Sequence, residues 1–404
     1  MLCACVPLSL ICERPCQETF GCDRNSLSVI TSSGTDSAHT GFLMKDLVDL
    51  TKALIRFKSM FSRPDEIRRC ADFIERFLKD IGITCKRIEC DGVPSIAALP
   101  GTDFAPVLLM SHLDVVDAPE ELFEPVEKNG KLYGRGSFDD KYAVALSMIL
   151  FREHLNKARK EGRGQGDLPL GILITGDEEA GGFKGAKESL KRIRTDFCIA
   201  LDGGNVRKIV TKEKGVLRLK LISRGKAAHG SRPWLGENAI EKLFEDYQSI
   251  KSFFREETAE HWHKTINFGM IKAGKSVNQV PDLAEAVFDI RYTEKDDVDA
   301  LVNQMRQKIK GELLMEIKEP LFLGGESPYL NLLLEISKDT TLGFEHGASD
   351  ARFLQEHGTP GIVWGPDGDL SAHAYDEHVN LDSLYELYGI LDGFFERAKE
   401  VMVS

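Results

Sequence analysis

The chain has 404 residues, of which 42% are hydrophobic and 29% are charged. This balance is typical of a globular protein with a sizeable core, and the length predicts two structural units rather than one. Acidic residues outnumber basic ones by 64 to 52, giving a formal net charge of −12 without any basic block. This charge argues against a nucleic-acid partner. No run of about 18 or more apolar residues occurs, so no membrane span is predicted.

The first 43 residues differ from the rest of the chain. They hold five of the nine cysteines, and the other four are scattered singly, as is usual for reduced thiols in the cytoplasm. The apolar opening, MLCACVPLSLIC, lacks the positive charge and the cleavage site of a signal peptide, so a cytoplasmic location is predicted over export. Residues 13–39 show no apolar periodicity, and a helical pattern begins near Met44. We therefore expect residues 1–43 to be a disordered or spurious extension.

Apolar periodicity then predicts a sheet with helices on both faces. A helical pattern covers residues 67–78 and ends near Gly82. Short apolar strands follow at 107–110, 172–175 and 197–201, with a helix at 141–155 between the first two. Short buried strands alternating with helices indicate an α/β fold.

A different rhythm over residues 214–320 predicts a second domain. It consists of a strand at 216–224, a helix, a strand pair around Gly269 and Val287, and another helix, which is an α+β pattern. A strand at 361–365 and a final helix resume the first pattern. The predicted architecture is a two-domain α/β protein with a mixed-sheet catalytic domain, 44–213 and 321–404, into which a small α+β domain is inserted.

Acidic and histidine side chains follow the predicted strands of the large domain. Ligands in open α/β sheets bind beyond the carboxyl ends of the strands, so these side chains are expected to lie together. The first strand is followed by His112 and Asp114, whose two-residue spacing points both to one face. The others are Asp139 and Asp140 before a helix, Asp177, Glu178 and Glu179 in one glycine-rich turn, Asp202, and His373 near the C-terminus.

Each of these motifs alone has an ordinary structural explanation, such as a surface pair, a helix cap, a solvated turn or a satisfied histidine. Their recurrence at successive strand ends favours a metal site, because crowded carboxylates are costly without a positive charge. Two histidines and several carboxylates, with no cysteine, suit Zn²⁺, although Co²⁺ and Mn²⁺ take the same donors.

With these motifs assembled, the chain from about residue 46 to its end resembles the M20 metallopeptidases, a family that includes succinyl-diaminopimelate desuccinylase, acetylornithine deacetylase and carboxypeptidase G2-like enzymes. The resemblance implies two zinc ions in each subunit. It assigns His112 and Asp202 to one ion, Glu179 and His373 to the other, and Asp139 to both. It also implies that Glu178 is the general base and that Asp114 orients His112.

The resemblance also implies that the small domain, 214–320, is a ferredoxin-like lid through which two chains form a homodimer. His229 of the lid would reach the active site of the other subunit. A carboxylate of the substrate would be held by Asn278 and Arg291 of the lid and by Ser349 and Arg352 of the GASDARF segment, since an arginine fork suits a carboxylate.

The predicted function is hydrolysis of an amide or peptide bond in a small carboxylate-bearing substrate, by a water that the metals activate and Glu178 deprotonates. A non-catalytic binding module of the same fold is the main alternative, followed by a two-metal phosphohydrolase and a purely structural protein. The sequence does not select the amide substrate. His261 and His263 also have ligand-like spacing, but they are predicted to be surface residues of the small domain.

Overall fold

The computed structural model describes residues 34–402, and the chain divides into two compact units between Leu43 and Met44. The first helix, α1 (Gly34–Ile55), is continuous across this division, so helical structure begins ten residues before the predicted start at Met44. Residues 1–33, which make up most of the predicted N-terminal extension, lie outside the described residues.

The larger sheet has nine strands. They are β1 (Lys86–Cys90), β2 (Val93–Ala98), β3 (Phe104–His112), β6 (Leu170–Thr175), β7 (Arg194–Ala200), β8 (Lys208–Glu213), β13 (Phe322–Leu323), β14 (Thr341–Glu345) and β15 (Gly361–Val363). The order across the sheet is β1-β2-β6-β3-β7-β15-β8-β13, and β14 pairs with β8. The central strands β6, β3 and β7 are parallel, whereas β1, β2 and β6 pair antiparallel. The sheet is therefore mixed, as predicted.

Both faces of this sheet are covered by helical elements, which is why its central strands are continuous apolar runs. One face packs against α4 (Ala186–Leu190) and the 3₁₀ helix η5 (Asp350–His357), with Leu108 and Met110 of β3 in the shared core. Helix α3 (Lys141–Lys160) also packs on strands β3 and β6, and its residues 141–151 are all buried. The remaining helices of this domain are α2 (Pro64–Asp80), α7 (Pro328–Ile336) and α8 (Leu381–Met402).

A small three-stranded sheet joins two loops that are distant in sequence. Its strands are β4 (Val126–Lys128), β5 (Lys131–Tyr133) and β16 (His378–Asn380), in the order β16-β5-β4. Antiparallel pairing places His378 opposite Tyr133. The loop after β5 and the loop before β16 therefore leave the sheet side by side.

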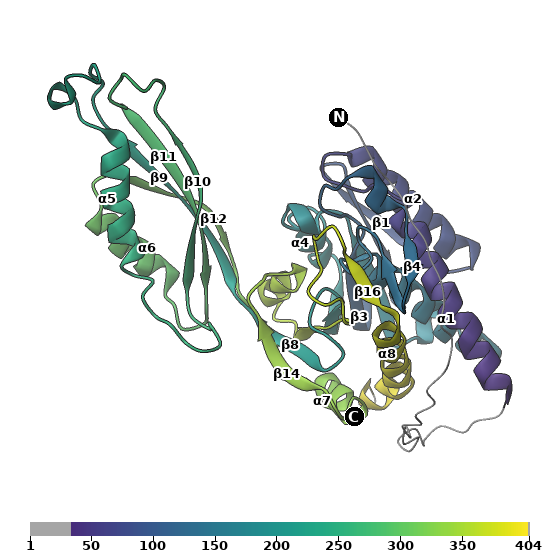
Figure 1. Cartoon of the computed structure of the whole chain (residues 1–404). Helices are drawn as coiled ribbons and strands as arrows, with labels where there is room; N and C mark the ends of the chain where they lie inside the picture. The colour runs from purple at the N-terminus through teal and green to yellow at the C-terminus, as the bar shows by residue number, and fades with distance from the viewer. Residues whose placement is uncertain (1–33, 403–404) are drawn as a thin grey trace, which may run out of the picture. The chain divides into compact units, whose positions relative to one another are not determined.

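The inserted segment forms a four-stranded antiparallel sheet with two helices (Figure 1). Its elements are β9 (Gly215–Arg224), α5 (Ala239–Lys251), β10 (Thr265–Ala273), β11 (Leu283–Tyr292), α6 (Val298–Lys308) and β12 (Glu312–Glu319). Alternate residues of β11, from Ala284 to Tyr292, are buried with Leu243 of α5 and Met305 of α6 in a separate core. The sequence analysis did not identify β12, whose alternation is interrupted by a bulge between Met315 and Ile317.

Within residues 34–402, no helix is both long enough and apolar enough to span a lipid bilayer.

Candidate metal centre

The candidate ligands lie beyond the carboxyl ends of three adjacent strands, β6, β3 and β7. His112 is the last residue of β3, and Asp202 follows β7. Glu178 and Glu179 lie in the 3₁₀ turn η3 (Glu178–Ala180) after β6, and Asp139 directly precedes Asp140, the N-cap residue of α3. His373 comes from the loop before β16. This arrangement is the one predicted for ligands at the edge of an α/β sheet.

Two triads share this edge. In the first, His112, Glu178 and Asp202 each offer one ligand atom, and these atoms lie within 4.8 Å of one another. The second triad, Asp139, Glu179 and His373, meets the same criterion. The Nε2 atom of His373 lies 3.2 Å from Oε2 of Glu179.

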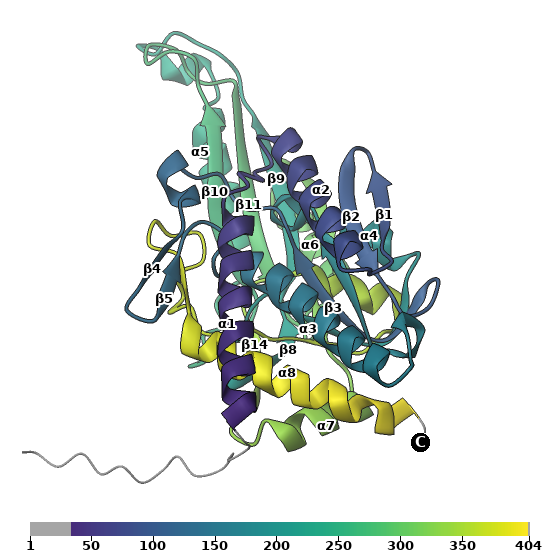
Figure 2. The same ribbon diagram turned by 90° about the vertical axis from the view of Figure 1, so that its right-hand side faces the viewer.

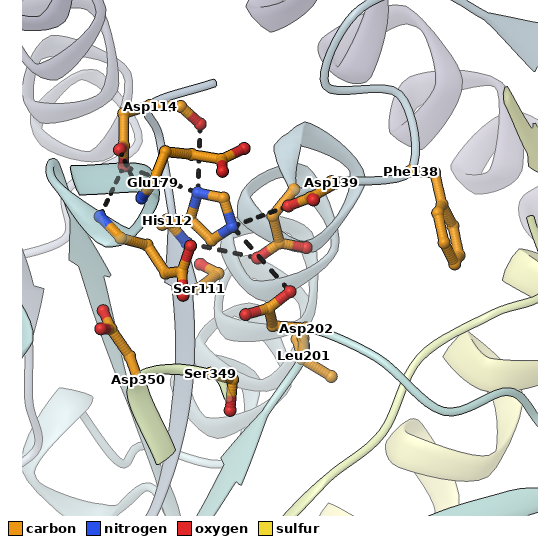
Figure 3. A network of polar contacts seen from close by, with 12 residues as sticks. Ser111, His112, Asp114, Phe138, Asp139, Glu179, Leu201, Asp202, Ser349 and Asp350 are labelled. Carbon is orange, nitrogen blue, oxygen red and sulfur yellow. Dashed lines mark hydrogen bonds and ion pairs between the residues drawn. The ribbon is translucent and has the colours of Figure 1, made fainter. Parts of the chain in front are cut away.

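Asp139 touches both triads through different oxygen atoms. Its Oδ1 lies 2.9 Å from Nε2 of His112, and its Oδ2 lies 3.1 Å from Nε2 of His373. Figure 3 shows the carboxylates of Asp139 and Asp202 directed toward the His112 ring. Asp139 therefore lies between the histidines of the two triads. This is the position expected for a ligand that is shared by two cations.

The donor atoms fit divalent cations. His112 places Nδ1 3.1 Å from the carbonyl oxygen of Asp114, so a proton on Nδ1 leaves the lone pair of Nε2 for a metal. Nε2 of His112 and Oδ1 of Asp139 are buried and have no hydrogen-bond partner in the described structure, although they lie close together. A cation bound by both atoms would explain why neither has a hydrogen-bond partner.

The electrostatics of the site also favour bound cations. Two like unit charges about 4 Å apart repel by about 4 kcal/mol at an effective dielectric constant of about 20. A typical hydrogen bond contributes only about 1 kcal/mol, so hydrogen bonds alone do not offset several crowded carboxylates. Burial, followed by the charge of Asp202, raises the pKa of Glu178 well above its usual value. Burial, followed by the charge of Asp139, does the same to the pKa of Asp202.

The pKa values of the two histidines are raised as well, which in a histidine favours the charged form. Hydrogen bonds to Asp139 and Glu179 raise the pKa of His373 to about 10. For His112, burial opposes the charged form, but the nearby carboxylates of Asp114 and Asp139 outweigh it and raise the pKa well above its usual value. Without a cation, protons on these groups therefore reduce the negative charge. Divalent cations at the same place would release those protons.

Asp114 and Asp140 accept hydrogen bonds from the backbone of the candidate ligands. The Asp114 oxygens accept hydrogen bonds from the backbone N–H groups of Glu178, at 3.1 Å, and Glu179, at 3.0 Å, which joins the η3 turn to the end of β3. Asp140 accepts the backbone N–H of His112 at 3.2 Å. Asp177, the first of the three consecutive acids, accepts the backbone N–H groups of Lys184 and Gly185 instead.

Glu377 is a supporting residue that the sequence analysis missed. Its Oε1 accepts the backbone N–H groups of Gly136, Phe138 and Asp139, and its Oε2 pairs with Arg135. The Arg135 guanidinium in turn donates to the carbonyl oxygen of His373 at 3.0 Å. Glu377 thus ties the loop of Asp139 to the loop of His373. Its position four residues after His373, in the SAHAYDEHV segment, was the available signal in the sequence.

Ser349 and Arg352, predicted to contact substrate, are buried and bonded within the protein. Ser349 donates its backbone N–H and its hydroxyl to Glu213. Arg352 donates to the carbonyl oxygens of Ser349 and Gly181, at 2.5 and 2.7 Å, and packs against the Phe353 ring. Both terminal nitrogens of Arg352 therefore bond to backbone carbonyls, whereas its buried Nε has no hydrogen-bond partner among the described residues.

Between these two residues lies Asp350, which the sequence analysis also missed. Its Oδ2 accepts the hydroxyl of Thr175 at 3.2 Å, and burial raises its pKa to about 7. Figure 3 places Ser349 and Asp350 beside the group formed by His112, Glu179 and Asp202.

The predicted residues of the small domain are not joined to the metal ligands by any contact recorded for residues 34–402. His229 is exposed, and its Nδ1 lies 2.8 Å from the hydroxyl of Ser231. Asn278 is also exposed, and its carbonyl oxygen accepts the backbone N–H of Gly230, beside His229. Arg291 donates to Asp289 at 2.8 Å. His229 and Asn278 therefore lie together, and Arg291 is partly committed to Asp289.

The prediction that His261 and His263 are surface residues is wrong for His263. His261 is exposed, but the side chain of His263 is buried, and its Nδ1 lies 3.0 Å from the carbonyl oxygen of Lys264. The ammonium group of Lys214 donates to the carbonyl oxygens of both histidines at 2.7 Å, which holds this segment against the start of β9.

Comparison with known proteins identifies the class to which this fold and site belong. Residues 108–397 match the model of peptidase family M20/M25/M40, so the chain belongs to this family and is a hydrolase. A succinyl-diaminopimelate desuccinylase from Coxiella burnetii is 24% identical over 375 residues, which cover 85% of this chain and 98% of that protein.

Solved structures share the fold. A tripeptidase from Staphylococcus aureus superposes with a TM-score of 0.72 at 19% identity, covering 88% of this chain and 99% of the other. A dinuclear metal-binding M20 peptidase from Bacillus subtilis superposes with a TM-score of 0.59 at 14% identity, covering 89% and 99%.

Replacing Glu377 by Gln should lower the zinc affinity of the centre by about 10- to 100-fold, the usual effect of losing a group that orients metal ligands. The amide keeps the size of the side chain but removes the charge that faces Arg135. Competition with a chromophoric chelator measures the affinity, and thermal unfolding verifies the fold. Glu335→Gln is a matched control, because it breaks an exposed pair with Arg397. Equal zinc affinity in both variants would refute the role of Glu377.

Proposed function

We propose that the chain is a dinuclear amidohydrolase that uses two zinc ions, with Co²⁺ or Mn²⁺ as substitutes, to cleave an amide or peptide bond of a small carboxylate-bearing substrate. The observation that carries this proposal is the position of Asp139, whose two oxygens face the histidines of the two triads at 2.9 and 3.1 Å. The description of the Bacillus subtilis relative as dinuclear supports the proposal.

The ligands divide between the two ions by proximity. His112 and Asp202 would hold one ion, and Glu179 and His373 the other, with Asp139 shared. Nitrogen and oxygen donors in this ratio suit zinc and its neighbours in the first transition row. When bound, the ions would polarise water and the scissile carbonyl.

Glu178 is the proposed general base. It belongs to the first triad, and the other two members of that triad, His112 and Asp202, are the ones assigned as metal ligands. Its backbone is fixed by Asp114, and burial raises the pKa of its carboxyl group, which is the direction expected for a group that accepts and returns a proton. Glu178 would take a proton from water as the water attacks the carbonyl carbon. It would then give the proton to the leaving nitrogen.

Recognition of the substrate carboxylate falls to the small domain in this proposal. The guanidinium of Arg352 is buried and occupied by carbonyl oxygens, so it positions the 349–352 segment instead of contacting substrate. Arg291 is partly exposed and paired with Asp289, and Asn278 is exposed. We assign the carboxylate to Arg291 and Asn278, which requires the small domain to act as a lid.

His229 would act across a homodimer formed through the small domain. It is exposed and lacks a recorded contact with the ligands of its own chain among residues 34–402. An imidazole N–H supplied by the second chain would stabilise the oxyanion that forms when water adds to the carbonyl.

Hydrolysis by the purified chain, first chelated and then reloaded with zinc, tests the proposed function. The substrates are N-succinyl-diaminopimelate, N-acetylornithine, other N-acyl amino acids, dipeptides and tripeptides. We expect chelation to abolish hydrolysis of one class and zinc to restore it. Phosphatase activity without amide hydrolysis would contradict the proposal, as would the absence of any turnover in a chain that holds two zinc ions.

Glu178→Gln should keep both zinc ions and lower kcat by at least about 10²- to 10⁴-fold, the usual contribution of a general base. The amide is nearly the same size as the carboxyl group but cannot accept the proton from water. Metal analysis and steady-state kinetics on the substrate found above measure both effects. Glu188→Gln, at a partly exposed position of α4 where the carboxylate pairs with Lys191, should behave as wild type. A rate near wild type in the Glu178 variant would refute the assignment.

Mixing two inactive variants tests whether His229 acts in the second chain. A dimer of Glu178→Gln with His229→Ala has one site that combines an intact Glu178 with an intact His229 of the partner. Random mixing of equal amounts should therefore restore about a quarter of wild-type activity, because half of the two-fold dimers are mixed. If His229 acted within its own chain, every site in the mixture would lack one group, and no activity would return.

A further inference from the structure

A third group of histidine and carboxylates lies on the helical layer of the large domain, away from the metal centre. It consists of His154 on α3 and of Asp392 and Glu396 on α8, and we call it the peripheral triad. We propose that the peripheral triad binds a divalent transition-metal cation, such as Zn²⁺, that joins α3 to α8. This site does not depend on the proposed catalytic function.

The helix geometry brings the three side chains together. Asp392 and Glu396 are four residues apart on α8 and therefore share one face of that helix. His154 reaches this face from α3, which lies beside α8 (Figure 2). One ligand atom from each residue lies within 4.8 Å of the others. Nε2 of His154 is 3.1 Å from Oδ1 of Asp392, and Nδ1 is 3.8 Å from Oε1 of Glu396.

The His154 ring is fixed and directed into the triad. Its side chain is only 4% exposed, and the ring meets Phe395 edge-on at a centroid distance of 5.8 Å. Nε2 is buried and has no hydrogen-bond partner among the described residues, although Oδ1 of Asp392 is close by. A buried imidazole nitrogen without a partner needs an explanation, and a cation between nitrogen and oxygen provides one.

The proposed catalytic centre also contains a buried histidine nitrogen that has no hydrogen-bond partner. There, Nε2 of His112 lies 2.9 Å from Oδ1 of Asp139, and neither atom has a hydrogen-bond partner. In both places a histidine nitrogen and a carboxylate oxygen approach each other without the alignment of a hydrogen bond. The repeated geometry supports a metal at the peripheral triad on the same ground as at the catalytic centre.

The charges around the peripheral triad are compatible with a cation. Lys157 pairs with Oε2 of Glu396 at 2.5 Å, whereas Oε1 is the oxygen that faces His154. The Lys157 side chain is 54% exposed and can move away at little cost. Among residues 34–402, no ion pair with a lysine or arginine is recorded for Asp392. Two carboxylates and one imidazole would leave positions for water, since Asp392 and Glu396 are 44% and 36% exposed.

The peripheral triad is distinct from the catalytic centre. His154 follows the N-cap residue Asp140 by 14 positions of one helix, and a rise of about 1.5 Å per residue separates them by about 20 Å. A cation at this distance cannot contact a substrate at the catalytic centre. It would instead stabilise the folded chain, because it binds the native arrangement of α3 and α8.

Zinc stoichiometry and thermal unfolding of the full chain test this proposal. After chelation, each protein is dialysed against buffered free Zn²⁺ and its bound zinc is measured by elemental analysis. We expect wild type to bind one zinc more per chain than Asp392→Asn/Glu396→Gln. Saturating zinc should raise the Tm of wild type further than that of the double variant. The rate of amide hydrolysis should be the same in both.

Matched variants separate the site from changes in charge or fold. Asp382→Asn/Glu400→Gln removes the same charge from exposed positions of α8 and should keep the additional zinc. His154→Gln should lose it. His112→Ala/His373→Ala should keep it while losing the catalytic ions, so failure of the catalytic proposal would not hide the peripheral site. Equal stoichiometry in wild type and in the Asp392/Glu396 variant would overturn the proposal, and so would equal loss in the Asp382/Glu400 variant.

Discussion

The structure depends on holding several carboxylates and two histidines at one edge of a sheet. Asp139 is the centre of this arrangement, because its two oxygens face His112 and His373. Burial opposes the charged form of Asp139, yet the adjacent rings of His112 and His373 lower its pKa. The same burial raises the pKa of Glu178 and Asp202. One carboxylate of the site is thus held ionised, whereas its neighbours resist ionisation. Bound cations would supply the positive charge that allows all of these carboxylates to ionise.

The surrounding structure supplies rigidity rather than that charge. Asp114 and Glu377 together accept five backbone N–H groups from the ligand loops, and Glu377 also pairs with Arg135. Lys141, at the start of α3, is fully buried and donates to the hydroxyl of Ser59 and to the carbonyl oxygen of Leu113, next to His112. These bonds fix the backbone around the ligands, and they use the nearby ammonium and guanidinium groups in doing so. Lys141 and Arg135 therefore do not neutralise the carboxylates of the candidate ligands, whose negative charge would attract cations.

Local patterns in the sequence were sufficient to predict that the candidate ligands lie together, and to predict most of the fold. Strand periodicity placed His112 and Asp114 on one face, and the position of each acid after an apolar run placed it at the sheet edge. Features that depend on distant pairing were missed or misassigned. The role of Glu377 arises from the pairing of β5 with β16, whose residues are far apart in sequence. Arg352 has the residue type expected for carboxylate binding, and only the fold shows that it also bonds to two backbone carbonyl oxygens. His263 likewise lies in a polar segment whose burial depends on Lys214.

The distribution of residues between the two domains has a consequence for function. All the candidate metal ligands belong to the large domain, whereas His229, Asn278 and Arg291 belong to the small one, which has its own sheet and its own core. Metal binding therefore needs no particular position of the small domain. In the proposed function, substrate recognition does need one, because Asn278 and Arg291 belong to the small domain and the guanidinium of Arg352 is buried. In this proposal the metal centre is assembled before substrate arrives, and the energy of binding a carboxylate brings the residues of the small domain to it.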